Sequence, residues 1–157
     1  MKFTVIKNLQ KDSAMSLILR GFLIFILLYL ISDIFVMKSN FGISPEALSA
    51  TLFGDEEAYI DPMNEASFLE FWHTHIFFIM MILLTLSSIF IRVAKKSRAV
   101  LTNTLMISAI LSLVSLPLAF YLSIFFVNVY LITYFLWHLA ALYMILYSFW
   151  KLNARSV

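Results

Sequence analysis

The sequence contains no cysteine. A chain without thiols cannot form disulfides, attach haem covalently in the c-type manner, or hold an iron–sulfur cluster through cysteine. Membrane enzymes that work by thiol–disulfide exchange are excluded for the same reason. Any cofactor of this protein must therefore be held by histidine, carboxylate or other groups that are not thiols.

Charged residues are also scarce. They make up 13% of the 157 residues, whereas hydrophobic residues make up 62% and the mean hydropathy is +0.95. A soluble domain has about 25% charged residues, so too little polar surface remains here to cover a water-soluble globule. This composition excludes a soluble enzyme, a disordered chain and a nucleic-acid-binding domain. It indicates a small integral membrane protein in contact with the lipid bilayer.

Four apolar segments are long enough to cross a membrane, which takes roughly 20 residues of helix. They run over about 15–37, 69–91, 99–120 and 129–150. We therefore predict an all-α integral membrane protein, with four transmembrane helices in an antiparallel bundle. The bundle is expected to form a single domain over residues 1–157, because no linker or internal repeat interrupts the chain.

The region 99–150 is too long for one span and must turn back once. A single helix of that length would reach about 78 Å at 1.5 Å per residue, whereas the hydrocarbon core is roughly 30 Å thick. Pro117 and Asn128 bracket the expected turn, because proline resists continuing a helix. The third and fourth helices should therefore form a tight hairpin around the connection 121–128.

The charges are distributed unequally between the two ends of the predicted bundle. Ten of the eleven basic residues lie at one end and Lys38 at the other, where eight of the nine acidic residues also lie. Cytoplasmic segments carry the excess of lysine and arginine, so both termini are expected in the cytoplasm and the protein in the plasma (inner) membrane. The first apolar run is too long for a typical signal peptide, so we expect an uncleaved helix.

The connection 38–67 is the longest segment outside the predicted spans and is expected on the outer side. Ser44 begins a Ser-Pro-Glu sequence, which is a typical helix start because serine caps the helix, proline suits its first position and an acid suits its first turn. Gly54 is a typical helix end. We therefore expect a short helix over about 45–53 that lies on the outer membrane surface or caps the bundle.

Ionisable residues inside a span are costly and often functional. All three histidines, His73, His75 and His138, fall within predicted spans, and so does Asp33. Counting 1.5 Å per residue from the cytoplasmic edge places Asp33 and His75 at about 25 Å and His138 at about 20 Å. We therefore predict that Asp33, His75 and His138 meet in one layer of the outer half of the bundle. The alternative for Asp33 is contact with the outer water.

Glu70 and His73 form a Glu-x-x-His pair on one helix face, because residues i and i+3 are neighbours on a helix. This spacing occurs among the metal ligands of four-helix carboxylate proteins. His75 lies about 200° around the helix from His73, so at most one of these two histidines can face the bundle core. Glu70 can instead end a capping box that begins at Ser67, and His73 can belong to the polar belt at the outer interface.

These side chains suit two redox cofactors. A b-type haem can be held by histidines on two helices, and His75 with His138 is the pair best matched in depth. A non-haem metal ion can instead be held by histidine and carboxylate groups, drawn from Glu70, His73 and Asp33 or from His138. Either cofactor in the outer half of the bundle would suit electron transfer with a quinol or an external redox protein.

The alternative function requires no cofactor. A four-helix protein with one outer loop can serve as a structural subunit or assembly factor of a larger membrane complex, and its buried histidines then make structural hydrogen bonds. Transport is the least favoured function, because four helices are few for a transporter and no pair of broken helices occurs at matched positions. An absorption spectrum combined with metal analysis separates the cofactor hypothesis from the subunit hypothesis.

Overall fold

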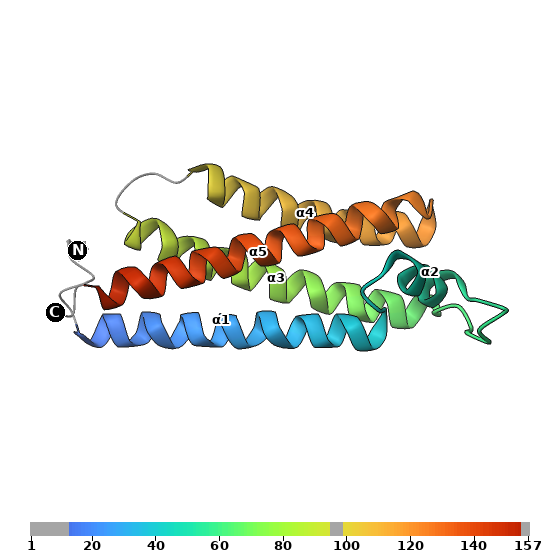
Figure 1. Ribbon diagram of the computed structural model, residues 1–157, viewed down its shortest axis with the longest axis horizontal. Helices are drawn as coiled ribbons and strands as arrows, with labels where there is room; N and C mark the ends of the chain where they lie inside the picture. The colour runs from blue at the N-terminus through green and yellow to red at the C-terminus, as the bar shows by residue number, and fades with distance from the viewer. Residues whose placement is uncertain (1–12, 95–98, 155–157) are drawn as a thin grey trace.

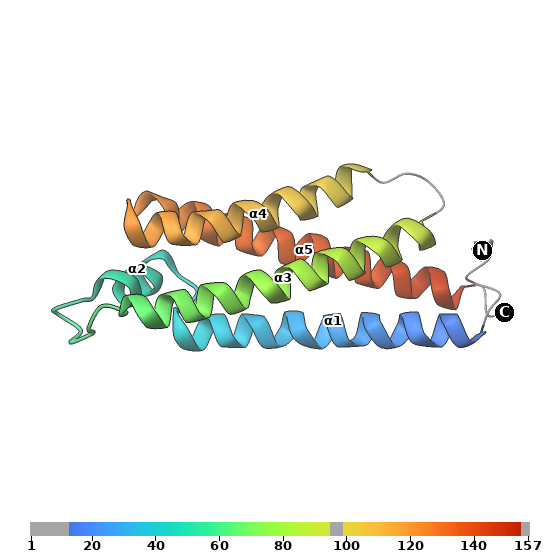
Figure 2. The same cartoon turned by 180° about the vertical axis from the view of Figure 1, so that it is seen from behind.

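The computed structural model describes residues 13–94 and 99–154. This part of the chain forms four long α-helices that run side by side and a short α-helix at one end of them (Figure 1 and Figure 2). The helices are α1 (Ser13–Asn40), α2 (Pro45–Phe53), α3 (Glu65–Val93), α4 (Ala99–Tyr121) and α5 (Phe125–Asn153).

The four long helices are each long and apolar enough to cross a membrane. The four spans predicted from the sequence lie within α1, α3, α4 and α5. The part of the chain that the structure describes contains no strand, although an isolated bridge pairs Asp55 with Ile60 in the first loop. The predicted all-α bundle with a short helix in its first loop is therefore confirmed.

The four long helices alternate in direction along the chain, so α1 begins and α5 ends at the same end of the bundle (Figure 1). In both views α3 and α5 form the centre, with α1 on one side and α4 on the other (Figure 2). α5 packs against every other helix, and most extensively against α4. A side chain on α5 can therefore meet side chains from any part of the bundle.

The short helix α2 caps the end of the bundle opposite to the start of α1 (Figure 1). The Ser44 hydroxyl accepts the backbone N–H of Ala47 at 3.2 Å, and Gly54 ends the helix with a φ of 85°. Leu48 and Leu52 are buried, and α2 packs against α5. Of the two positions that the sequence allowed for this helix, the structure has the one on top of the bundle.

The start of α3 differs from the sequence prediction. The helix begins at Glu65, and its N-cap is Asn64, whose side-chain oxygen accepts the N–H of Ser67 at 2.9 Å. Ser67 therefore lies inside the first turn and cannot begin a capping box with Glu70. That interpretation of Glu70 is wrong because asparagine is as good an N-cap as serine and occurs three residues earlier in the chain.

The turn between α4 and α5 is shorter than predicted. Residues 122–124 separate the two helices, because Pro117 lies inside α4 and Asn128 inside α5. Proline lacks the N–H that would bond the carbonyl four residues earlier, which is that of Leu113. The indole Nε1 of Trp72 on α3 donates to this carbonyl at 2.9 Å. The helix therefore passes through the proline with the freed carbonyl paired.

Candidate functional site

Asp33 is a buried carboxylic acid on α1, with 7% of its surface exposed. Two phenols donate hydrogen bonds to it. The Tyr29 hydroxyl donates to Oδ1 at 3.2 Å, and the Tyr134 hydroxyl on α5 donates to Oδ2 at 2.9 Å. A buried carboxylate is costly unless it is paired and hydrogen-bonded, so these two bonds help to explain how Asp33 is accommodated within a membrane span.

Two histidines, one on each of two other helices, lie against the carboxylate of Asp33. His75 Nδ1 on α3 is 3.6 Å from Oδ1 of Asp33, and His138 Nε2 on α5 is 3.2 Å from Oδ2. Both histidines are 5% exposed. The structure therefore brings Asp33, His75 and His138 together in one layer, as the count of depth predicted. The alternative in which Asp33 faces the outer water is wrong, because its side chain points into the bundle.

The ring nitrogens of the two histidines are held in different ways. Nδ1 of His138 lies 2.8 Å from the backbone carbonyl of Tyr134. A carbonyl only accepts hydrogen bonds, so this contact is a hydrogen bond when Nδ1 carries a proton. Nε2 of His138 is within ion-pair distance of Asp33 but has no aligned hydrogen bond, and Nε2 of His75 has no hydrogen-bond partner among the described residues.

This arrangement leaves Nε2 of His75 without a partner among the described residues, whereas Nε2 of His138 meets Oδ2 of Asp33. A histidine that binds a metal usually donates its other ring N–H to a carboxylate or a backbone carbonyl, which fixes the tautomer and the ring orientation. Nδ1 of His138 faces a carbonyl and Nδ1 of His75 faces the carboxylate of Asp33. Both histidines therefore match the outer-shell pattern of metal-binding histidines.

Aromatic rings hold the two imidazoles in place. The His138 ring centroid lies 3.8 Å from the ring centroid of Trp137 and 4.2 Å from that of Tyr134. The His75 ring stacks on Phe71 at 5.3 Å. These contacts restrict rotation of both side chains, so their nitrogens are directed by packing as well as by hydrogen bonds.

The polar layer lies between two apolar clusters. On the side of α2, the buried cluster includes Met37, Phe68 and Val127. On the opposite side, a larger cluster includes Leu30 and Ile79 and continues to the far end of the bundle. Water is therefore excluded from both sides of the layer, and the low dielectric strengthens every electrostatic interaction inside it.

Glu70 and His73 are not part of this layer. Both are exposed on the outside of α3, because the helix turns about 200° between His73 and His75. The carboxylate–histidine set of Glu70, His73 and Asp33 is therefore not brought together. Within residues 13–94 and 99–154, no group of three or more acidic or histidine side chains is arranged to hold one metal ion.

Tyr29 and Tyr134 were missed by reasoning from the sequence. Each lies four residues before a member of the layer, Tyr29 before Asp33 and Tyr134 before His138. Side chains at i and i+4 share a helix face, so this spacing was the available signal. It was obscured because tyrosine is also common in the interfacial belts of membrane proteins.

Comparison with known proteins identifies the type of protein and nothing more specific. A family model described as a transmembrane helical domain matches residues 42–156. No curated protein matches the chain, and no solved structure matches it. The match covers α2 to α5, and the part of α1 that carries Asp33 lies before it.

Proposed function

The chain belongs to the family of transmembrane helical domains, and from this premise we propose that it is a membrane redox protein. Its bundle holds a metal-centred cofactor with Nε2 of His75 and Nε2 of His138 as ligands. A b-type haem is the first candidate, because His75 and His138 on two neighbouring helices could hold its iron and no third protein ligand would be needed. When bound, the haem supplies one-electron transfer.

The observation that carries this proposal is the pair of buried Nε2 atoms on α3 and α5. A buried polar atom without a hydrogen bond costs about 1–3 kcal/mol, and such atoms are rare in folded proteins. Nε2 of His75 has no hydrogen bond, Nε2 of His138 meets only Oδ2 of Asp33 at 3.2 Å, and the companion Nδ1 of each ring is directed at an oxygen acceptor. Ligation would use both Nε2 atoms in this arrangement. The exposed His73 has neither feature.

Asp33 would act as a charge partner in this site. A carboxylate beside both imidazoles would offset the positive charge at the iron centre of a bound cofactor in a low dielectric. The hydroxyls of Tyr29 and Tyr134 hold the carboxylate in place. Asp33 is therefore assigned a positioning and electrostatic role beside the two ligands.

A non-haem metal ion is the second candidate. The side chains of Asp33, His75 and His138 are not arranged to hold one ion in this structure, so Asp33 would become a third ligand only by moving with the two histidines towards the ion. Two atoms that bind one ion at about 2.1 Å lie roughly 3 Å apart when the bond angle is near 90°. The 3.2 Å between Nε2 of His138 and Oδ2 of Asp33 is close to that value. The 3.6 Å contact of His75 with Oδ1 is made by its Nδ1, so in this site Nδ1 would replace Nε2 as the ligand from His75. Two histidines and one carboxylate form a donor set that iron(II) accepts.

The placement of the site suggests its partners. Among the described residues the acidic side chains gather towards the α2 end, whereas Arg20, Arg92 and Lys151 lie towards the other end. The positive-inside rule then puts the start of α1 in the cytoplasm and α2 outside the plasma membrane. The site then lies in the outer half of the bilayer, where a quinol or an external redox protein can exchange electrons with it.

An alternative from another class is a cofactor-free subunit of a larger membrane complex. The observation that favours it is the contact of Asp33 with both histidines. A protonated His138 would satisfy that carboxylate without any metal, and the layer would then only hold α1, α3 and α5 together. A pull-down that recovers a larger complex, from a protein without chromophore or metal, would support this function.

One experiment separates these functions. The full chain is purified in detergent, and its absorption spectrum and metal content are compared with those of His75→Ala, His138→Ala and His73→Ala. Haem predicts a Soret band that is lost in the first two variants and kept in His73→Ala, which is the matched control on the exposed face of α3. A non-haem metal predicts stoichiometric metal without a Soret band, lost in the same two variants. A protein with neither chromophore nor metal contradicts the proposal.

A further inference from the structure

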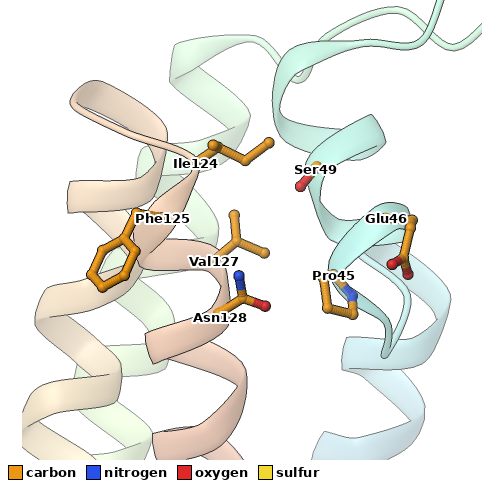
Figure 3. A pocket seen from close by; sticks show the side chains of 7 residues that line it. All are labelled: Pro45, Glu46, Ser49, Ile124, Phe125, Val127 and Asn128. Atoms are coloured by element: carbon orange, nitrogen blue, oxygen red, sulfur yellow. The ribbon is translucent and has the colours of Figure 1, made fainter.

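A groove opens between α2 and the first turns of α5. Its volume is about 350 Å³, and its lining includes Pro45 and Ser49 of α2 and Ile124, Val127 and Asn128 beside it. Figure 3 shows Ile124, Val127 and Asn128 directed towards α2, with Pro45 and Ser49 facing them across the gap. The groove is at the end of the bundle closer to the proposed redox site.

We propose that this groove binds the headgroup of a membrane quinone or quinol. The proposal deepens the redox function given above and rests on it, because it names the class of small molecule that would meet the site. Small-molecule sites are concave and mostly apolar, with a few polar groups that fix orientation, and they commonly have volumes of about 300–1,000 Å³. The groove between α2 and α5 lies within this range of volume and has both apolar and polar residues in its lining.

The side chains of the groove match the two faces of a quinone ring. Pro45 and Ile124 provide exposed apolar surface for the flat ring. The amide of Asn128 and the hydroxyl of Ser49 lie on opposite walls, and both can donate to a quinone carbonyl or accept from a quinol hydroxyl. A ligand with apolar faces and polar edges at both ends of the ring uses all of these groups.

The charge at the groove favours a neutral occupant. Glu46 also lines it. Hydrogen bonds from its own backbone N–H and from the Ser44 hydroxyl hold the pKa of Glu46 below its usual value. Glu46 is therefore ionised at neutral pH, and the loop that follows α2 carries further acids at Asp55, Glu56 and Glu57. Like charges repel a phospholipid phosphate, whereas a quinone carries no charge.

Buried aromatic rings connect the groove with the redox site. Val127 on the groove wall is 1% exposed, and Tyr130 on the next turn of α5 is fully buried. The Tyr130 ring centroid lies 5.7 Å from that of Tyr134, which in turn lies 4.2 Å from that of His138. From Val127 to His138 the helix rises about 16 Å. A ring in the groove is therefore joined to His138 by two tyrosine rings that pack in sequence.

Binding is tested on the full purified chain by calorimetric titration with a short-chain ubiquinone and with a short-chain menaquinone. We expect saturable binding of at least one of them, with Kd raised about tenfold in Asn128→Leu, which corresponds to one lost hydrogen bond of about 1.4 kcal/mol. The matched control is Asn103→Leu, because Asn103 lines a groove of about 370 Å³ between α4 and α5. That variant should bind the quinone as tightly as the unaltered protein.

A second variant, Ser49→Trp, fills the groove with an indole and should abolish binding while leaving the metal or haem content unchanged. The proposal is overturned if neither quinone binds saturably, or if Asn128→Leu binds like Asn103→Leu. It is also overturned if phosphatidylglycerol in the detergent displaces the quinone, since the groove would then prefer a phosphate. Quinone binding by a protein without any cofactor would refute the redox function, whereas normal cofactor content without quinone binding would refute only the groove.

Discussion

The carboxylate of Asp33 receives two phenolic hydroxyls and lies within 4 Å of two imidazoles, so one side chain connects three helices. In water such contacts would be worth little, because solvent competes for every partner. Between two apolar clusters no solvent competes, and a partner that is removed leaves the others unpaired. The layer is therefore sensitive to the number of acceptor atoms at this one position.

Replacing Asp33 with alanine should destabilise the protein by about 2 kcal/mol, because the hydroxyls of Tyr29 and Tyr134 lose their acceptor in a buried site. Asp33→Asn keeps one acceptor oxygen and should lose less. Thermal unfolding in detergent, followed by circular dichroism, measures both variants. An unchanged midpoint for Asp33→Ala would show that the two hydroxyls find other partners.

The sequence was enough to predict how deep a residue lies in the membrane, but not which way its side chain faces. The rise per residue was enough to predict that Asp33, His75 and His138 share a layer, because helix rise is nearly constant. Which of His73 and His75 faces the core depends on the rotation of α3, and that rotation is set by packing across the whole helix. The sequence therefore left both histidines as candidates. The predicted metal site with Glu70 and His73 used the face of α3 that points away from the bundle.

At the scale of single elements, the helices contain, or are flanked by, residues that depart from regular helix geometry or hydrogen bonding. α2 is entered and left through glycines with positive φ, 75° at Gly42 and 85° at Gly54. α4 contains Pro117, and the carbonyl that this proline frees is bonded by Trp72. Each irregularity is visible in the sequence as a glycine or a proline. The residue that compensates for Pro117 is Trp72, which lies 45 residues away on another helix.

Gly42→Ala should destabilise α2 by at least 1–2 kcal/mol, because alanine at positive φ is strained and its Cβ would collide with the Cβ of Ala47. Gly21→Ala is the matched control, since a Cβ there meets nothing within 4 Å and alanine favours a helix interior by roughly 0.5–1 kcal/mol. Thermal unfolding of the two variants should therefore shift in opposite directions. Equal shifts would contradict the assigned backbone conformation of Gly42.

Trp72→Phe should cost about 1 kcal/mol, because the Leu113 carbonyl loses its donor inside a membrane span. In the background of Pro117→Ala the same change should cost much less, since an alanine at that position supplies the missing backbone N–H. A double-mutant cycle on thermal or denaturant unfolding measures the difference. Additive effects of the two changes would show that the indole bond does not compensate for the proline.

The elements themselves were largely predictable, and their ends were not. Long apolar runs identify spans because a transmembrane helix must be both long and hydrophobic. The short helix α2 could be predicted because Ser44 is a typical N-cap and Gly54 a typical C-cap. Pro117 was expected to end a helix, because the sequence alone cannot show that Trp72 reaches the freed carbonyl. Asn64 was passed over as a cap for α3 because the apolar run begins several residues later.

At the scale of the whole molecule, the distribution of charge and the arrangement of helices agree. The start of α1 and the end of α5 lie at the same end of the bundle, and α2 lies at the other (Figure 1). The order of helices follows from short connections and alternating direction. The central position of α3 and α5 could not be read from the sequence, because each long helix is apolar enough to face either lipid or protein.

The proposed orientation is tested by cysteine labelling, which needs no prior removal of native thiols because the chain has none. Glu57→Cys, in the loop after α2, should react with a membrane-impermeant maleimide added to intact cells. Ala154→Cys, after α5, should react after the cells are broken and is the control for sidedness. The opposite pattern would place α2 in the cytoplasm and reverse the orientation, although the bundle itself would be unchanged.

The contacts of α5 with all four other helices have a consequence for how the protein is made. α5 follows the other helices along the chain, so the ribosome synthesises it after them, and Asp33 and His75 enter the membrane before His138 and Tyr134 exist. During that interval the hydrogen bond from Tyr29 is the one that α1 itself supplies to the carboxylate of Asp33. Insertion of α5 closes the polar layer and supplies the central packing surface in a single event. A chain truncated before α5 should therefore form only a loosely associated set of helices, which membrane proteases would degrade faster than the full chain.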